Sequence, residues 1–241
     1  MRKLLRALAV CAALFSALFG DDKAAREIME KVDARNEGDR MTADMEMILI
    51  DKNKDRRVRS LRQFRRDEGE DSYKLIFFLE PSDVRNTGFL TYDYDDPDKD
   101  DDQWLYLPAL KKSKRIASSD KSSSFMGSDF SYGDMASREL DDYDFKLIEE
   151  REVNGRKVWV IECVPRTKKV IDESGYTKSL LLVRQDNFVI VRAVHYEKKQ
   201  GRIKLMDITK LEQIDGIWQP LEIQMTSKQG AETLHGTILR F

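Results

Sequence analysis

Hydrophobic and polar positions repeat with two different periods along this chain of 241 residues. After Asp21 and Asp22, which suit the start of a helix, the apolar residues follow a helical period. They are Ala24, Ala25, Ile28, Met29 and Val32. From Thr42 onward the period changes to two, which is typical of strands. We therefore expect one amphipathic helix followed by a chain built of strands.

Turn-forming sequences interrupt the strand pattern about every ten residues. Asn154-Gly155, Asp215-Gly216 and Gln229-Gly230 are examples. This spacing, with almost no helix between the strands, predicts a mainly β (α+β) fold with a meandering antiparallel sheet of about eleven strands. A sheet of that size closes toward a barrel or splits into a sandwich, and a large enough barrel can enclose a ligand. No repeat or low-complexity linker divides residues 21–241, so we expect a single domain.

The first twenty residues have the features of a secretory signal peptide. Three basic residues accompany an apolar run over residues 4–19 that ends at Gly20. The run is short for a membrane span, and a charged helical pattern follows it instead of a stop-transfer sequence. We expect export to the periplasm with cleavage near Gly20. A lipoprotein modified at Cys11 is the alternative, but Val10 stands where a small residue is required.

Charge and cysteine content narrow the class of protein. Without the three basic residues of the signal segment, 39 of the 42 Lys and Arg remain against 44 Asp and Glu. Nucleic-acid-binding proteins usually present a net basic surface, so we expect no nucleic-acid partner. Only Cys163 remains outside the signal segment, which excludes an intrachain disulfide. The domain must therefore be held together by packing alone.

An aspartate-rich segment lies between two predicted strands. Its members are Asp93, Asp95, Asp96, Asp98, Asp100, Asp101 and Asp102. A calcium loop that begins at Asp96 would need Gly and Glu where the chain has Asp101 and Leu107. We therefore expect a solvated hairpin tip and no metal site.

Basic residues gather along residues 56–66 and again after Pro108. Such residues either protect an exposed sheet edge or contact anionic headgroups, which is worth about 1 kcal/mol per residue near a membrane surface. The candidates for headgroup or membrane contact are Arg62, Arg65, Lys111, Lys112, Lys114 and Arg115.

The sequence lacks the signatures of catalysis. GSDFSYG departs from G-x-S-x-G, because Asp129 stands where the first glycine around Ser131 is required. His195 and His235 fall on predicted strands without metal-ligand spacing, and Cys163 lies in the apolar stretch VWVIECVP. We expect neither an enzyme nor a cofactor; a lipid hydrolase that uses Ser131 or His195 is the remaining catalytic alternative.

Residues 104–135 combine loop chemistry with large apolar side chains. Ser118 to Ser124 predict a flexible connector. The apolar residues then stand at irregular spacing around Gly127 and Gly133: Phe125, Met126, Phe130, Tyr132 and Met135. They indicate either a loop packed on a satellite core or a mobile lid over an apolar cavity. We call residues 118–135 the lid segment.

Four stretches make the sequence similar to the outer-membrane lipoprotein-sorting proteins, relatives of the periplasmic lipoprotein carrier LolA. They are FLEPSDVRNTGFL (78–90), WLYLPALKKSKRI (104–116), SFMGSDFSYGDM (124–135) and DGIWQPLEIQM (215–225). The resemblance implies a half-open antiparallel β-barrel wrapped over helices, with a hydrophobic cavity for acyl chains and no catalytic activity. The middle two stretches resemble a branch linked to exporters of the resistance-nodulation-division type, and for this branch the cargo is open between lipoproteins and other lipids.

Together these observations predict a monomeric periplasmic carrier that takes a lipoprotein or lipid from an inner-membrane transporter toward the outer membrane or a receptor there. Shielding a sixteen-carbon acyl chain from water is worth about 12 kcal/mol, at roughly 0.8 kcal/mol per CH₂. The predicted cavity residues are Met45, Met47, Leu49, Leu75, Phe77, Phe89, Trp104 and Tyr106, and the pattern leaves open which alternating set points inward. The alternative function is a non-carrier accessory protein of an exporter that docks through the basic strand and the aspartate loop.

Overall fold

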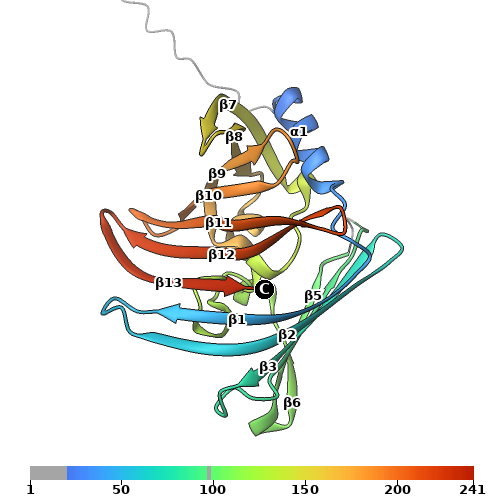
Figure 1. Ribbon diagram of the computed structural model, residues 1–241, viewed down its shortest axis with the longest axis vertical. Coiled ribbons are helices and arrows are strands. Elements are labelled where there is room, and N and C mark those ends of the chain that lie inside the picture. Colours follow the sequence, from blue (N-terminus) through green and yellow to red (C-terminus); the bar gives the residue numbers. More distant parts are fainter. Residues whose placement is uncertain (1–20, 97–98) are drawn as a thin grey trace, which may run out of the picture.

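A single antiparallel sheet dominates the computed structural model, which describes residues 21–96 and 99–241 (Figure 1). The expected signal peptide, residues 1–20, lies outside the described residues. The strands are β1 (Arg40–Ile50), β2 (Arg56–Glu68), β3 (Asp71–Glu80), β4 (Gly88–Asp93), β5 (Asp102–Leu107), β6 (Lys112–Arg115), β7 (Tyr143–Val153), β8 (Arg156–Pro165), β9 (Tyr176–Arg184), β10 (Ile190–Glu197), β11 (Arg202–Ile214), β12 (Ile217–Gln229) and β13 (Glu232–Arg240).

The sheet is open rather than closed, and over the described residues it has thirteen strands instead of about eleven. Its order is β6-β5-β4-β3-β2-β1-β13-β12-β11-β10-β9-β8-β7, so β6 and β7 form the two edges. The all-polar strand β6, with the sequence KSKR, has no hydrophobic alternation that would reveal it. Figure 1 shows the sheet curling, with the chain between β6 and β7 lying in the hollow of the curve.

Two hairpin turns follow the sequence prediction. Asn154 and Gly155 have φ angles of 51° and 73°, and Asp215 and Gly216 have 51° and 84°. Two successive positive φ angles match the right-handed twist of the flanking strands, and Asn, Asp and Gly tolerate them best. These turns set the registers of β7 with β8 and of β11 with β12.

The predicted opening helix is confirmed as α1 (Lys23–Asp33). The Asp22 side chain accepts a hydrogen bond from the Ala24 N–H (2.9 Å), which satisfies one free donor of the first turn. The buried face of α1 belongs to the apolar cluster that includes Phe145 and Ile161, and the Asp22 N–H donates to the Phe145 carbonyl (2.8 Å). The helix therefore covers the concave face at the β7 end.

A second helix, α2 (Lys168–Ser174), was not predicted. Its seven residues bury only Val170, so its sequence has little apolar periodicity. The Thr167 side chain caps its start and Gly175, with φ 81°, ends it. Neither α1 nor α2, the two α-helices of the described residues, is long and apolar enough to cross a membrane.

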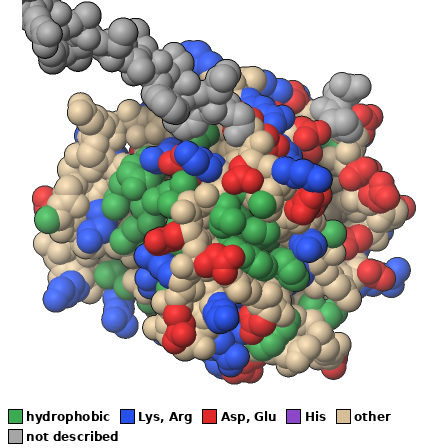
Figure 2. Space-filling view, turned by 90° about the horizontal axis from the view of Figure 1, so that it is seen from above, with side chains coloured by type: hydrophobic (Ala, Val, Ile, Leu, Met, Phe, Trp, Pro, Cys, Tyr) green, Lys and Arg blue, Asp and Glu red, His purple; other side chains and the backbone are tan. Residues whose placement is uncertain are grey.

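Alternation along each strand gives the sheet two different faces. On the concave side Met47, Leu61 and Phe89 are each 1% exposed and belong to the main apolar cluster. Neighbours in β3 show the contrast, since Phe78 is fully buried whereas Phe77 on the convex side is 37% exposed. Charged residues, 36% of the chain, surround separate hydrophobic patches on the end of the molecule seen in Figure 2.

Candidate functional site

The apolar side chains of the lid segment fill the hollow of the sheet. Phe125, Phe130 and Tyr132 are at least nine-tenths buried and belong to the same cluster as Phe78 and Phe89. The ring centroid of Phe125 lies 4.9 Å from that of Phe89 and 6.1 Å from that of Phe78, and Tyr132 lies 5.6 Å from Phe89. The lid therefore packs on the main core of this half of the sheet, and no satellite core lies beneath it.

The lid is a folded loop with short 3₁₀ turns, at Ser118–Asp120, Phe125–Gly127 and Gly133–Met135. The Phe125 N–H donates to the Phe130 carbonyl (2.7 Å), which closes a tight turn around residues 126–129. Met126 and Gly127 have φ angles of 51° and 77° there, a left-handed conformation that glycine adopts without strain. The irregular spacing of apolar residues follows from these turns, since no regular helix or strand orders them.

Asp129 fastens this turn to the sheet through a buried carboxylate. It accepts hydrogen bonds from the hydroxyls of Ser227 (2.6 Å) and Thr237 (2.8 Å) and contacts Nδ1 of His235. Its own N–H donates to the Thr237 hydroxyl (2.9 Å). A buried charge is stable only when paired and hydrogen-bonded, so this cluster holds the lid segment against β12 and β13.

Three further hydrogen bonds hold the lid at other points. They run from Arg59 Nη1 to the Met126 carbonyl (2.6 Å), from Gln103 Nε2 to the Tyr132 carbonyl (2.7 Å) and from the Tyr176 hydroxyl to Asp134 Oδ2 (2.9 Å). Burial lowers the pKa of Arg59 and raises the pKa of Tyr176 well above its usual value. Strands β2, β5, β9, β12 and β13 thus each contribute an anchor.

A groove of about 550 Å³ opens between lid residues 122–129 and the rim of the sheet. The rim consists of residues at the turns β1–β2, β10–β11 and β12–β13. Lys204 and His235 line it from the sheet, and Ser122 and Asp129 line it from the lid. Most residues that line the groove are polar, and it borders the place where the lid segment meets the buried apolar residues of the sheet.

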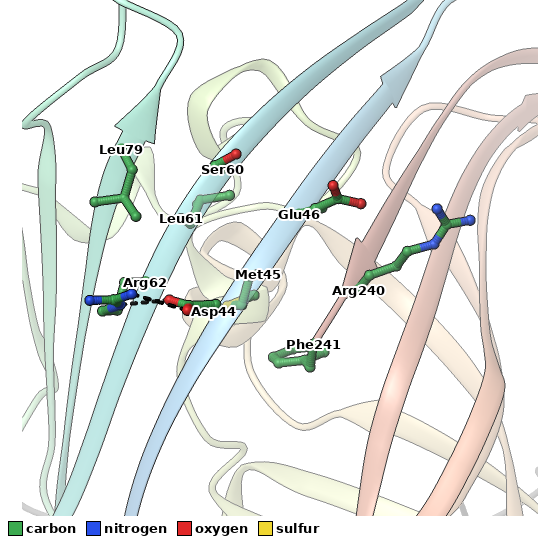
Figure 3. A pocket seen from close by; sticks show the side chains of 9 residues that line it. All are labelled: Asp44, Met45, Glu46, Ser60, Leu61, Arg62, Leu79, Arg240 and Phe241. Carbon is green, nitrogen blue, oxygen red and sulfur yellow. Dashed lines mark hydrogen bonds and ion pairs between the residues drawn. The ribbon is translucent and has the colours of Figure 1, made fainter.

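A second depression, of about 420 Å³, lies beside β1, β2 and the C-terminal residue Phe241 (Figure 3). Asp44 and Arg62 form a two-pronged ion pair there, with N–O distances of 2.6 and 3.0 Å. Both side chains are exposed, so the pair adds little stability. Arg62, a predicted headgroup contact, thus already has a carboxylate partner.

The eight predicted cavity residues do not share one face of the sheet. Met45, Met47, Leu49 and Phe89 are buried on the concave side. The other four, Leu75, Phe77, Trp104 and Tyr106, point to the convex side. There Phe77, Trp104 and Tyr106 remain 36–39% exposed. The period of two identified both sets as strand residues but did not show which set lies inside.

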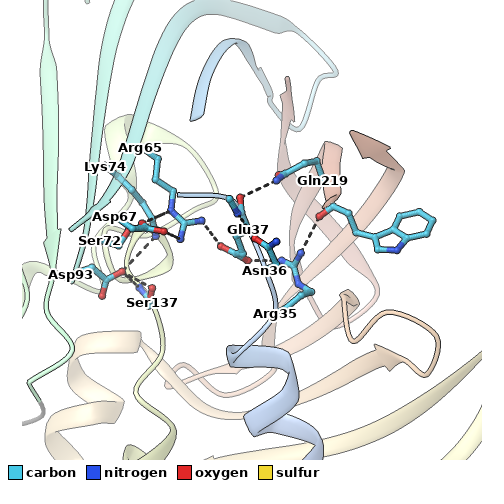
Figure 4. A network of polar contacts seen from close by, with 12 residues as sticks. Arg35, Asn36, Glu37, Arg65, Asp67, Ser72, Lys74, Asp93, Ser137 and Gln219 are labelled. Carbon is cyan, nitrogen blue, oxygen red and sulfur yellow. Dashed lines mark hydrogen bonds and ion pairs between the residues drawn. The ribbon is translucent and has the colours of Figure 1, made fainter. Parts of the chain in front are cut away.

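The other predicted basic residues occupy two environments. Arg65 is mostly buried and pairs with Glu37 (2.7 Å) and Asp67 (3.2 Å) in a polar network between the linker after α1 and strands β2 and β3 (Figure 4). The remaining four, Lys111, Lys112, Lys114 and Arg115, are exposed at the edge strand β6 and the turn before it. Their contact with headgroups stays a prediction.

The aspartate-rich segment lies largely in the hairpin between β4 and β5. Asp93 is buried and accepts a hydrogen bond from the Ser137 N–H (3.0 Å), and Asp101 accepts one from the Tyr94 N–H (3.1 Å). Burial and the neighbouring Asp93 raise the pKa of Asp101 to about 6. Within residues 21–96 and 99–241 no group of three His, Cys, Asp or Glu side chains is placed to hold a metal ion.

Several anchors of the lid were missed by reasoning from sequence. Ser227 and Thr237 are single polar residues on strands, and nothing in their local sequence marks them; Arg59 belongs to the basic stretch 56–66, which gives no sign of its contact with the lid. Only the pairing of β13 with both β1 and β12 brings these three to the lid. In the sequence, Asp129 stands out only because it replaces the first glycine of the hydrolase motif G-x-S-x-G.

Comparisons with known proteins agree with this architecture. A family model described as an uncharacterized protein matches residues 70–241. The structure of a protein described as an outer membrane lipoprotein-sorting protein domain, from Vibrio parahaemolyticus, is 34% identical, with a TM-score of 0.80 over 90% of this chain and 89% of that chain. This chain belongs to the outer membrane lipoprotein-sorting protein family.

Two further solved structures are similar to that of this lipoprotein-sorting family member. A DUF1329 family protein from Desulfovibrio piger is 29% identical, with a TM-score of 0.82 over 92% of this chain and 91% of that chain. A LolA superfamily protein from Nitrosomonas europaea is 20% identical, with a TM-score of 0.66 over 90% of both chains, which shows a LolA-like fold. No curated protein matches the sequence.

Proposed function

We propose that this protein is a periplasmic carrier that holds the acyl chains of a lipoprotein or lipid against the concave face of β1–β5. One observation carries the proposal: an apolar loop fills the hollow of an open sheet and is fastened at its rim by a few polar side chains. A loop of this kind can leave as a unit, and Met47, Phe78 and Phe89 would then line an apolar floor.

Exchange of the lid for a cargo is energetically reasonable. Burial of Phe125, Phe130 and Tyr132 is worth about 1.5–3 kcal/mol each. A sixteen-carbon acyl chain gains about 12 kcal/mol when it leaves water. The gain of the acyl chain therefore exceeds the loss from these three side chains, while the closed lid protects the floor when no cargo is bound.

The family relationship supports the direction of transport. The relative from Vibrio parahaemolyticus is described as an outer membrane lipoprotein-sorting protein domain. We infer that this carrier accepts cargo from an inner-membrane transporter and releases it at the outer membrane or at a receptor there.

The accessory-protein alternative is favoured by one observation, that the protein's own side chains occupy the hollow. Mass spectrometry of lipid extracted from protein purified from its native periplasm separates the two functions. A carrier is expected to bring about one acylated molecule per chain, whereas an accessory protein with a permanently filled core brings none.

Fastening the lid tests its role directly. Cysteines at positions 129 and 237, where the lid backbone already contacts the Thr237 side chain, would tie the lid to β13 when oxidised. We expect the oxidised variant to exclude a fluorescent acyl lipid and the reduced variant to take it up. Equal uptake by both forms would rule out the lid as the gate.

A further inference from the structure

A row of polar side chains crosses the concave face of five neighbouring strands. The strand registers place directly beside one another Ser179 in β9, His195 in β10, Lys204 in β11, Ser227 in β12 and His235 in β13. The next row on the same face, two residues along each strand, is mainly apolar: Leu181, Ala193, Met206, Met225 and Thr237. The sheet therefore offers a polar stripe beside an apolar one.

Lys204, at the centre of the polar row, lines the groove and makes no ion pair within the described residues. The residue is 9% exposed, and within the described residues its side chain has no carboxylate oxygen within 4 Å and makes no hydrogen bond. Its nearest aromatic contact is the Tyr176 ring, with Nζ 5.5 Å from the centroid. Because this ammonium lines the groove without a carboxylate beside it, an anion in the groove could take that place.

The groove of about 550 Å³ brings more donors to the same place. Arg202 lines it, and its Nε is buried without a hydrogen bond, with the Glu197 carboxylate 3.9 Å away. Arg57 lines it from β2 and likewise has no carboxylate within 4 Å among the residues described.

Four carboxylates also border the groove: Asp51, Asp55, Asp129 and Glu197. Asp129 accepts from the hydroxyls of Ser227 and Thr237 and contacts His235. Asp51 accepts from two backbone N–H groups of the β1–β2 turn, at 2.8 and 3.0 Å. Within the described residues, none of the four carboxylates lies within 4 Å of the Lys204 ammonium.

We propose that this groove binds a phosphate group, with Lys204 as its central donor and Arg57 and Arg202 beside it. Phosphate oxygens suit this arrangement, because they accept several charge-assisted hydrogen bonds from ammonium and guanidinium groups at once. The proposal rests on the carrier function, since the acyl chains of the same molecule would lie beside this groove, on the concave face of β1–β5 beneath the lid. It narrows the cargo to a phosphate-bearing amphiphile, because an acylated lipoprotein N-terminus is uncharged and would leave Lys204 unpaired.

Calorimetric titrations with three probes test this site: dihexanoyl phosphatidic acid, dihexanoyl glycerol and inorganic phosphate. The proteins are the full-length mature chain, its Lys204→Met variant and a Lys228→Met control, whose residue follows Ser227 and points to the opposite face. We expect the unmodified protein to bind the phosphatidic acid at least tenfold more tightly than the glycerol. Lys204→Met should remove that preference without weakening binding of the glycerol. Unchanged binding of the glycerol also shows that this variant is folded. Lys228→Met should keep the preference for the phosphatidic acid.

The outcomes separate the phosphate site from the carrier function. Equal binding of the two lipids, unchanged in Lys204→Met, overturns the phosphate site and leaves the carrier intact. Binding of inorganic phosphate that Lys204→Met abolishes, with no binding of either lipid, supports a site for free phosphate and overturns the carrier. If neither phosphate compound binds, the site is overturned.

Discussion

At the scale of single residues, Asp129 connects the lid to the sheet more extensively than any other polar side chain described in the lid. Asp129→Asn keeps the shape but removes the charge that Ser227, Thr237 and His235 surround. We expect a loss of about 1–3 kcal/mol in the free energy of lid closure. Uptake of a fluorescent acyl lipid, followed by stopped flow, should become roughly tenfold faster.

Asp120→Asn is the matched control for that experiment. Asp120 also lies in the lid, but its carboxylate is exposed and, among the residues described, pairs with Lys114 alone (3.4 Å). An exposed ion pair contributes little, so uptake should be unchanged. Equal rates for both variants would mean that the buried cluster does not control opening.

His195 predicts a pH dependence of stability. It is buried, its Nδ1 lies 2.8 Å from the Ser179 hydroxyl, and burial lowers its pKa to about 4. Because the unfolded chain takes up this proton near pH 6.5, the contribution of neutral His195 is fully present above about pH 6.5 and is lost as the pH falls toward about 4. Urea unfolding at about pH 7 and pH 5 should show a smaller decrease for His195→Gln than for the unmodified protein.

Comparison of His195→Gln with the unmodified protein at about pH 7 separates the loss of packing from the effect of protonation. The variant loses the stack on Tyr176, whose ring centroid is 4.4 Å from that of His195, at every pH. Only the difference between the two proteins in how the free energy of unfolding changes with pH reports the protonation of His195. Parallel slopes would show that His195 is not neutralised by burial.

At the scale of elements, the lid depends on close backbone packing at Gly133. A Cβ placed there would lie 3.0 Å from the Glu173 carbonyl oxygen in α2. We expect Gly133→Ala to destabilise the protein by about 1–3 kcal/mol through overpacking. Gly236→Ala in β13 is the control, since its nearest neighbour, the Met225 carbonyl oxygen, is 3.5 Å away and needs no displacement. Thermal unfolding of both variants checks this, and equal melting temperatures would contradict it.

Elements with a strong local signal could be predicted from the sequence. The helix α1 has a cap at Asp22 and a regular apolar face, and the turns at Asn154 and Asp215 have residues that tolerate positive φ. The strand β6 and the helix α2 lack such signals because KSKR has no alternation and α2 buries one residue. Both elements form because neighbouring parts of the fold position them.

The candidate site could be predicted only in part, since its apolar lid residues are visible in the local sequence and its polar row is not. The apolar lid residues, such as Phe125 and Tyr132, stand out locally because they interrupt a polar loop. The polar row through Lys204 consists of residues from five strands that meet only through sheet register. Local periodicity carries no information about such pairings.

At the scale of the whole molecule, curvature decides which face of the sheet is the interior. Phe77 and Phe78 are successive residues of β3 with opposite environments, at 37% and 0% exposure. Phe78 packs under the lid with Phe125, whereas Phe77 lies on the convex face against Phe64, with ring centroids 6.5 Å apart. The pair therefore tests the inside and the outside of the sheet within one strand.

We expect Phe78→Ala to lower the free energy of unfolding by about 3–5 kcal/mol, because it leaves a cavity between the sheet and the lid. Phe77→Ala should cost only about 1–2 kcal/mol, since much of its ring is already in water. Urea denaturation measures both losses, and acyl-lipid binding to the folded variants shows which face the cargo uses. Binding should change for Phe78→Ala and remain unchanged for Phe77→Ala, because the proposed function has the cargo replace the lid segment, which covers the concave face. The reverse result would move the cargo site to the convex face, where Trp104 and Tyr106 lie.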